Sequence, residues 1–380
     1  MTRKASPPGR ALVLPWLALL GVIVAVTLPL DAARPDSLLA YQGSGAWAVI
    51  AVMTFASVAA ARHRGNGIAI VLLAVASHAG ALVVFGVLDD VAGHPGPGFW
   101  SLLAAAWLLA WCLVFRLSAL KPGRPLDALV LKIAVPLLFG AWVLMLWQVG
   151  VVAFKVPFVL LPPPSAIFSK LTESVAIVAV DFRQTFLKAV LAGYVIGCGA
   201  GFLVAILVDR VPFLSRGLLP IGNFVSALPI VGVAPIMVMW FGFDWQSKAA
   251  VVVIMTFFPM LVNTVAGLAA AEPMSRDLMR TYAASYWQSL FKLRLPQALP
   301  FVFNALKINS TLALIGAIVA EFFGTPIVGM GFRISTEVGR MNIDMVWAEI
   351  AVAAVAGSAF YGVMALIERA CTFWHPSFRS

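Results

Sequence analysis

Long apolar runs separated by short polar segments dominate this chain. About ten of the runs reach or approach the roughly twenty residues that an α-helix needs to cross the hydrocarbon of a bilayer. A helix satisfies its own backbone hydrogen bonds in lipid, whereas a lone strand does not. The pattern therefore predicts an all-α, polytopic integral membrane protein. The runs are Ala11 to Leu30, Ala46 to Ala61, Ile68 to Leu88, Phe99 to Leu117, Ile133 to Ala153, Phe182 to Val208, Leu218 to Phe241, Ala249 to Ala270, Phe301 to Phe323 and Val346 to Ile367.

A short stretch that contains Pro122, Gly123 and Pro125 separates the first four runs from the last six. We therefore expect a four-helix amino-terminal membrane extension over residues 1–120, a linker over 121–132 and a six-helix core over 133–374. Nothing in the extension names a ligand. It is interpreted either as a regulatory or assembly module or as additional surface that faces lipid.

Composition agrees with a membrane protein. Of the 380 residues, 62% are hydrophobic and 11% are charged, against about a quarter charged in globular proteins. The net charge of +10 is spread over many polar segments without forming a stripe, which disfavours a nucleic-acid partner. When the amino terminus is placed inside, the cytoplasmic segments receive about twice as many Lys and Arg residues as the outer ones, as the positive-inside rule expects. Both termini are therefore predicted to be cytoplasmic.

The first run has a second interpretation as a signal peptide, with Ala32 and Ala33 near a cleavage site. The run is longer than an ordinary signal-peptide core. Its removal would also invert the distribution of basic residues, so we expect it to be retained.

The polar segment over residues 271–300 stands out between two apolar runs. Tyr286, Leu290 and Leu293 recur at helical spacing beside Trp287, which predicts a short amphipathic helix. Pro296 and Pro300 lack backbone N–H donors and are expected to end that helix before the next span. An alternative is an amphipathic helix that rests on the bilayer. Four basic residues surround the segment and predict that it faces the cytoplasm: Arg276, Arg280, Lys292 and Arg294.

This segment resembles the cytoplasmic loop of the permease subunits of bacterial ABC importers. That loop has the pattern EAA, three residues, Gly, nine residues, Ile, one residue and Leu-Pro. When Pro296 is aligned with the final Pro, Leu293 takes the position of the Ile, Ala283 that of the Gly, and 277–279 (Asp-Leu-Met) that of EAA.

Three further stretches carry the resemblance, Ser226 to Lys248, Phe257 to Leu268 and Ala313 to Gly324. They are similar to the nitrate, sulfonate and taurine branch of these permeases, and most of all to permeases for thiamine precursors or riboflavin. The resemblance covers roughly Leu131 to Trp374 and implies a type I importer core of six helices.

The resemblance implies the function and the partners. Two permease subunits, identical or homologous, would form a pathway across the bacterial inner membrane, served by cytoplasmic ABC ATPase subunits and a periplasmic or lipid-anchored substrate-binding protein. The substrate would be a small vitamin or precursor such as a pyrimidine or riboflavin, or otherwise nitrate, a sulfonate or taurine. The residues expected in the ATPase-coupling loop are Asp277, Arg280, Ala283, Tyr286, Trp287, Leu290, Leu293 and Pro296, with Tyr286, Trp287 and Leu290 as apolar anchors.

Several kinds of chemistry are missing from the sequence. No Gly-Lys dipeptide occurs, so the chain has no Gly-rich phosphate loop, and ATP would be hydrolysed by the partner ATPase. The cysteines are widely separated, and His63, His78, His94 and His375 show no metal-ligand spacing. We therefore expect no catalytic residues, no cofactor and no metal in this chain, which is not an enzyme by itself.

The seventh run contains Pro229, Gly232 and Pro235, which are expected to break its helix and to shape the pathway, or only to bend it for packing. Glu321 ends the ninth run and either lines the pathway or pairs with a basic group such as Arg333.

Other ionisable residues within the spans have simpler interpretations. Lys307 is expected to extend to the headgroups, Glu349 to lie at the interface and His78 to be a hydrogen-bonded packing residue. A secondary transporter or channel driven by an ion gradient is the alternative function, and it predicts coupled acids and bases near the middle of the membrane.

Overall fold

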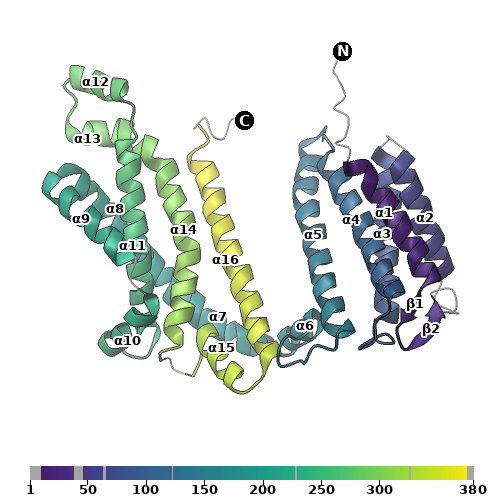
Figure 1. Ribbon diagram of the computed structural model, residues 1–380. Helices are drawn as coiled ribbons and strands as arrows, with labels where there is room; N and C mark the ends of the chain where they lie inside the picture. The colour runs from purple at the N-terminus through teal and green to yellow at the C-terminus, as the bar shows by residue number, and fades with distance from the viewer. Residues whose placement is uncertain are drawn as a thin grey trace, which may run out of the picture. The chain divides into compact units, whose positions relative to one another are not determined.

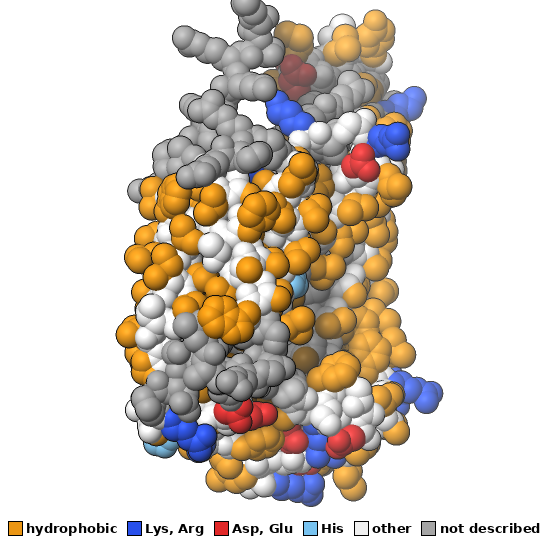
Figure 2. All heavy atoms as spheres, turned by 90° about the vertical axis from the view of Figure 1, so that its right-hand side faces the viewer, with side chains coloured by type: hydrophobic (Ala, Val, Ile, Leu, Met, Phe, Trp, Pro, Cys, Tyr) orange, Lys and Arg blue, Asp and Glu red, His pale blue; other side chains and the backbone are white. Residues whose placement is uncertain are grey.

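A computed structural model describes residues 10–37, 46–62, 66–121, 123–226, 229–324 and 327–374 (Figure 1). His63 and His375 lie outside these ranges. Within them, seven helices are long and apolar enough to cross a membrane, and three shorter apolar helices accompany them. These helices correspond to the ten predicted apolar runs and confirm the all-α, polytopic architecture. On the face shown in Figure 2, hydrophobic side chains cover the middle and charged side chains gather at the two ends, as expected of a protein surrounded by lipid.

The chain divides into two compact units, 1–166 and 167–380. The first unit contains five apolar helices: α1 (Arg10–Thr27), α2 (Ala46–Arg62), α3 (Asn66–Leu88), α4 (Pro97–Ser118) and α5 (Pro125–Ala153). A small antiparallel hairpin, β1 (Pro29–Asp31) and β2 (Arg34–Ser37), follows α1. The apolar patterns of the sequence did not indicate this hairpin, because its strands are only three and four residues long.

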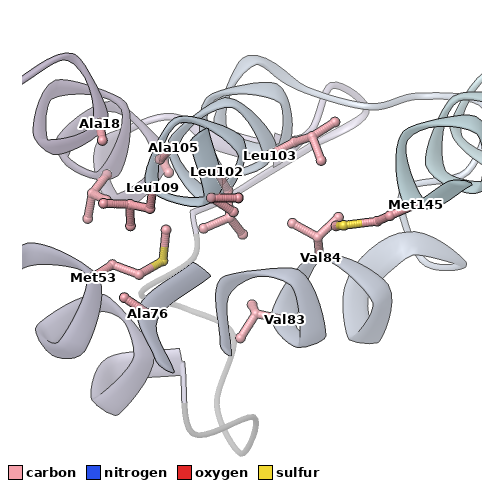
Figure 3. Close-up of a cluster of buried hydrophobic side chains, with 14 of the residues drawn as sticks. Ala18, Met53, Ala76, Val83, Val84, Leu102, Leu103, Ala105, Leu109 and Met145 are labelled. Carbon is pink, nitrogen blue, oxygen red and sulfur yellow. The ribbon is translucent and has the colours of Figure 1, made fainter. Parts of the chain in front are cut away.

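Small residues allow the helices of the first unit to pack closely. Ala18, Ala76 and Ala105 are fully buried in its core. Figure 3 shows Met53 between Ala76 and Leu109, which come from neighbouring helices. Helices in lipid gain little from the hydrophobic effect when they associate, so close van der Waals packing at small side chains has to supply much of the stabilisation.

The helix α5 belongs to the first unit by its contacts. Its Trp142, Met145 and Val149 lie in the same core cluster as α1 to α4. Its Gln148 accepts from the Ser165 N–H at 3.0 Å and donates to the Ser165 hydroxyl at 3.0 Å. Most of the expected linker over 121–132 belongs to α5, which begins at Pro125, and the compact units divide near residue 166.

The second unit is built around α11 (Trp245–Ala269), which packs against α8 (Leu191–Arg210) and α14 (Leu295–Glu321). Its other helices are α7 (Val175–Phe182), α9 (Pro212–Ser226), α10 (Ile230–Phe241), α12 (Pro273–Thr281), α13 (Tyr286–Ser289), α15 (Met330–Gly339) and α16 (Ile343–Cys371). A further short helix, α6 (Pro164–Glu173), begins at the boundary between the units, one residue before Ser165.

Glycines bring α8 and α11 close together. Gly193, Gly197 and Gly201 recur at every fourth position of α8. A Cβ on Gly197 would lie 2.1 Å from the Thr256 hydroxyl, and one on Gly201 would lie 2.5 Å from a backbone oxygen of α11. Such small residues at intervals of four allow two membrane helices to pack backbone against backbone.

Two helices of the second unit are unusually long. α7, a π-helical segment η1 (Arg183–Val190) and α8 run as one helix over Val175–Arg210. α13, a second π-helical segment η2 (Leu290–Arg294) and α14 run as another over Tyr286–Glu321. Both contain 36 residues, and α11 packs against both.

The seventh apolar run does not form one helix. It is divided between α9 and α10, and Pro229 stands at the start of α10 with extended backbone angles. The expected break is confirmed at this point. Pro235 lies inside α10, whose helix continues past it.

Lys307, which was expected to extend to the headgroups, pairs with an acid inside the second unit. Its Nζ lies 2.6 Å from Glu368 Oε2 of α16, and the two side chains are 18% and 9% exposed. His78 Nδ1 lies 2.8 Å from the Ala74 carbonyl of its own helix, so the side chain is hydrogen-bonded as expected; its ring meets the Trp142 ring edge on, but the residue is exposed.

The ion pair between Lys307 and Glu368 yields a stability prediction. Replacing Glu368 by Leu alone leaves the Lys307 charge unpaired in a mostly buried place, at an expected cost of about 3–5 kcal/mol of unfolding free energy. Replacing Lys307 by Met together with Glu368 by Leu should restore most of that loss. Denaturant unfolding of the detergent-solubilised protein measures both values, and an equal loss in the single and double variants would contradict the pairing.

Candidate functional site

The segment over 271–300 folds as a helix, a turn and the start of a second helix. α12 contributes no buried residue and extends with α13 past the ends of α11 and α14 (Figure 1). Five large apolar side chains of the segment are exposed: Met274 at 76%, Leu278 at 57%, Tyr282 at 78%, Trp287 at 47% and Phe291 at 58%. The predicted residues Asp277 and Arg280 form an exposed ion pair on α12 at 3.8 Å.

A left-handed residue makes the turn between α12 and α13. Ala283 has a φ of 51° and donates its N–H to the Arg280 carbonyl at 2.9 Å. Ser285 then caps α13, because its hydroxyl accepts from the Gln288 N–H while the Gln288 side chain accepts from the Ser285 N–H. Ala283 is the residue aligned with Gly in the importer pattern. The backbone angle explains why Gly suits that position.

An ion pair fastens the base of this loop to the end of α8. Arg294 donates through both terminal nitrogens to the Asp209 carboxylate, with Nη1 at 2.8 Å from Oδ2. The Tyr286 hydroxyl donates to the same Oδ2 at 2.8 Å. The guanidinium of Arg210 lies over the rings of Tyr286 and Trp287, at 5.5 and 5.6 Å from their centroids.

The loop is also fastened to the end of α11. Arg276 donates to the carbonyls of Leu268 and Ala269 at 2.7 and 2.9 Å, and Arg294 Nε donates to the Leu268 carbonyl at 3.2 Å. The last carbonyls of a helix have no partner within it and carry partial negative charge, so cationic side chains stabilise them. The loop therefore cannot shift as a unit without moving the ends of α8 and α11.

Pro296 does not end the helix that begins at Tyr286, and that prediction was wrong. The π-helical segment η2 lets the Leu295 N–H bond to the Leu290 carbonyl, five residues back. The wider π-helical turn precedes Pro296, which occupies the first turn of α14. The first N–H groups of a helix have no carbonyl partner within it, so the N–H that Pro lacks costs little there. The helix merges with the span that follows.

Leu290 is not an exposed anchor. It is fully buried in a cluster with Leu268 and Ala298, and Tyr286 packs against this cluster. Leu293 and Pro296 are partly buried in the same helix. Of the three predicted anchors, only Trp287 is exposed. Helical spacing correctly indicated an apolar face, but that face packs inside the chain.

A second polar cluster lies at the other end of the two long helices. Three successive backbone N–H groups at the start of α15 each donate to a side chain. Gly329 donates to Asp181 Oδ1 at 2.6 Å, Met330 to the Thr185 hydroxyl at 2.8 Å and Gly331 to Glu321 Oε2 at 2.7 Å. Thr185 in turn donates to Glu321 Oε1 at 2.8 Å. Two carboxylates thus occupy a helix N-terminus, where negative charge is favoured.

Glu321 therefore bonds to Thr185 and to the Gly331 N–H, and not to the expected basic group Arg333. The cation Arg333 pairs with Asp181, through Nε at 2.8 Å from Oδ2, and not with Glu321. Burial alone would lower the pKa of Arg333, but the hydrogen bond and the charge of Asp181 raise it above its ordinary value. Gly329 has a φ of +134°, and a Cβ there would lie 2.7 Å from Glu321 Oε1, so only Gly fits against this carboxylate.

The predicted pathway residues do not come together in one place. Glu321 is buried in the cluster with Asp181 and Thr185, whereas Gly232 is exposed on α10. A small apolar hollow of about 250 Å³ lies beside α10, and Ile230, Val233 and Met255 are among the residues that line it. Pro229 is the residue before Ile230 in the sequence, and neither Pro229 nor Glu321 lines the hollow.

Asp209, Asp181 and Thr185 were not predicted from the sequence as site residues. The two acids adjoin long apolar runs, where a charge needs a partner or contact with water. Their position beside apolar runs could therefore have marked both acids as candidates. The partners Arg294 and Arg333 are 85 and 152 positions away, so spacing along the chain could not identify them.

Comparison with known proteins gives the family. Residues 193–372 match the family described as the binding-protein-dependent transport system inner membrane component. A probable ABC transporter permease protein of Haemophilus influenzae is 30% identical over 220 residues, 58% of this chain and 89% of that protein. The formylaminopyrimidine transport permease protein ThiX of Halalkalibacterium halodurans is 30% identical over 243 residues, 63% of this chain and 95% of that protein.

The chain belongs to this permease family. The riboflavin transport system permease protein RibX of Chloroflexus aurantiacus is 28% identical over 236 residues, 62% of this chain and 87% of that protein. The resemblance to importer permeases, including the expected branch, is therefore confirmed. These relatives are transport permease subunits and not enzymes. The family match begins in α8 and includes α9 to α16 with the whole loop over 271–300, and helices α1 to α7 lie outside it.

Ala283 gives a first test of the loop. Replacing it by Gly should raise the unfolding free energy by up to about 1 kcal/mol. An L-residue pays about 1–2 kcal/mol to adopt the left-handed conformation, which Gly avoids, and the greater backbone entropy that Gly loses on folding offsets part of this gain. Replacing it by the β-branched Val should lower stability. Thermal unfolding in detergent compares the two, and a Gly variant as unstable as the Val variant would be incompatible with the turn.

Asp209 gives a second test. Replacing it by Ala removes the anion that Arg294 and Tyr286 share, so hydrogen exchange of the backbone over 286–294 should accelerate. The matched control is Asp277 replaced by Ala, which removes only the exposed pair with Arg280 and should leave exchange unchanged. Equal exchange in the Asp209 variant and the unmodified protein would show that this ion pair does not hold the loop.

Proposed function

We propose that this chain forms the translocation pathway of an ATP-driven importer and receives an ABC ATPase at its 271–300 loop. Membership of the permease family makes the chain the membrane component of an ABC transporter. The observation that carries the proposed coupling is the loop itself: an exposed helix and turn fixed at its base to the ends of α8 and α11.

The exposed side chains suit a protein partner. Leu278, Tyr282 and Trp287 supply apolar and aromatic contact area, which dominates the energy of many interfaces. The exposed charges of Asp277 and Arg280 would surround that area and adjust electrostatic fit. In this proposal the chain binds no nucleotide, and the ATPase subunit hydrolyses ATP.

Force applied to the loop would reach the far end of the second unit. Arg294 sits at the start of one 36-residue helix and is bonded to Asp209 at the end of the other. The same two helices also meet through Thr185, in the π-helical segment η1 of the first, and Glu321, the last residue of the second. When ATPase closure displaces the loop, the two helices would move as one body and shift the start of α15, which bonds to Thr185 and Glu321.

The proposed orientation places the loop and both termini in the cytoplasm, since basic residues gather on that side. Helices α10, α15 and the outer polar cluster would then face the periplasm, where a substrate-binding protein would deliver its cargo. A second permease, identical or homologous, would cover α10. Val231, Met239 and Trp240 expose 56%, 82% and 70% of their surface there.

The substrate we propose is a small heteroaromatic vitamin or vitamin precursor. Relatives are described as riboflavin and formylaminopyrimidine transport permeases. Others are described as permeases for aliphatic sulfonates, taurine and bicarbonate, so small anions such as these or nitrate are the next candidates.

The test is co-purification of the ATPase. The chain is purified from its native membranes, and the ATPase subunit is identified by mass spectrometry and by vanadate-sensitive ATP hydrolysis. Replacing Leu278, Tyr282 and Trp287 by Ala should abolish its recovery. The control replaces by Ala three exposed apolar residues at the opposite end of the unit, Ile327, Val338 and Met341, and should leave the recovery of the ATPase unchanged. If the unmodified chain retains no ATPase, the importer proposal fails, and transport driven by an ion gradient becomes the leading alternative.

A further inference from the structure

Glu349 is a buried acid without a hydrogen-bond donor. It lies near the start of α16 with no exposed surface, and neither carboxyl oxygen has a partner among the described residues. The sequence predicted a location at the membrane interface for Glu349, and the structure adds that its side chain is buried inside the second unit. A carboxylate buried in this way would cost several kcal/mol unless another group satisfied it.

The polar side chain considered as a partner for Glu349 is another acid, Asp181. Asp181 of α7 is also fully buried, α7 packs against α16, and the charge of Asp181 acts on Glu349. Both Asp181 oxygens already accept hydrogen bonds, from the Gly329 N–H and from Arg333. Two ionised carboxylates can only accept, so these acids cannot bond to each other unless one of them carries a proton.

The charges that face Glu349 come from three other elements: Asp181 on α7, Glu321 on α14 and Arg333 on α15. Arg333 is the cation among them, and its Nε is committed to Asp181 while its Nη1 faces Glu337 at 4.0 Å. Glu321 already accepts from Thr185 and Gly331. The surroundings therefore supply more negative than positive charge.

We propose that Asp181 and Glu349 form a buried proton-binding site, in which Glu349 holds the proton and donates it in a hydrogen bond to Asp181. One proton supplies the missing donor and removes one negative charge from the cluster. Both Asp181 oxygens accept hydrogen bonds, from the Gly329 N–H and from Arg333, so Asp181 is the acceptor of the pair and Glu349 the donor.

The bound proton would join α16 to α7 beside the start of α15. Its loss would place two negative charges side by side in a buried space, where their repulsion is strong. The contact between α16 and α7 would then open. The site thus makes the packing of these helices depend on pH, and this inference holds whether or not the proposed ATPase coupling is correct.

Infrared spectroscopy of the detergent-solubilised full chain tests the site directly. At neutral pH the unmodified protein should show the C=O stretch of a buried carboxylic acid, and Glu349→Gln should lose it, since its amide donates to Asp181 in place of the acid. Asp181→Asn should also lose the band, because its amide would donate to an ionised Glu349. The control Asp344→Asn, on the same helix, should keep the band. If the band is absent from the unmodified protein or remains in Glu349→Gln, the proposal is wrong.

Stability as a function of pH gives an independent readout. The unfolded chain ionises Glu349 at neutral pH, whereas the folded chain keeps the proton, so folded protein binds more protons and its stability falls as pH rises. The unfolding equilibrium constant should increase by up to about tenfold per pH unit in the unmodified protein relative to Glu349→Gln. The same pH dependence in both proteins would overturn the proposal. Neither measurement involves ATPase binding, so failure here is distinct from failure of the proposed function.

Discussion

The ion pair between Asp209 and Arg294 is the contact on which the geometry of the second unit depends most. Helices in lipid gain little from the hydrophobic effect when they associate, so polar contacts and close packing decide their arrangement. This ion pair joins the end of one 36-residue helix to the start of another, and Arg294 also binds the last turn of α11. The exposed loop beyond it can therefore act on three membrane helices at once.

The same helices also meet in a second set of polar contacts, where Thr185 bonds Glu321 and both hold the start of α15. These two ties make the pair of helices a rigid connection between the two surfaces of the unit. Each helix contains a π-helical segment next to its tie, and such segments often occur where function requires local adjustment.

Much of this architecture could be predicted from the sequence because a span of lipid imposes a length and an apolar composition. All ten apolar runs correspond to helices, and the segment over 271–300 forms an exposed helix and turn between two of them. Local rules failed where distant contacts intervened. Pro296 was expected to end a helix that a π-turn carries through, and Leu290 was assigned to a surface that in fact packs against Leu268. Glu321 and Lys307 found partners that no spacing along the chain could identify.

Site-specific photo-crosslinking tests the central claim, that the turn between α12 and α13 contacts the ATPase, most directly. A photoreactive phenylalanine analogue at Tyr282, which is 78% exposed at that turn, is irradiated in native membranes. The account predicts a crosslink to the ATPase subunit that is absent when the analogue replaces Met341 at the opposite end. Crosslinks only to lipid, or equal ATPase crosslinks from both positions, would contradict it.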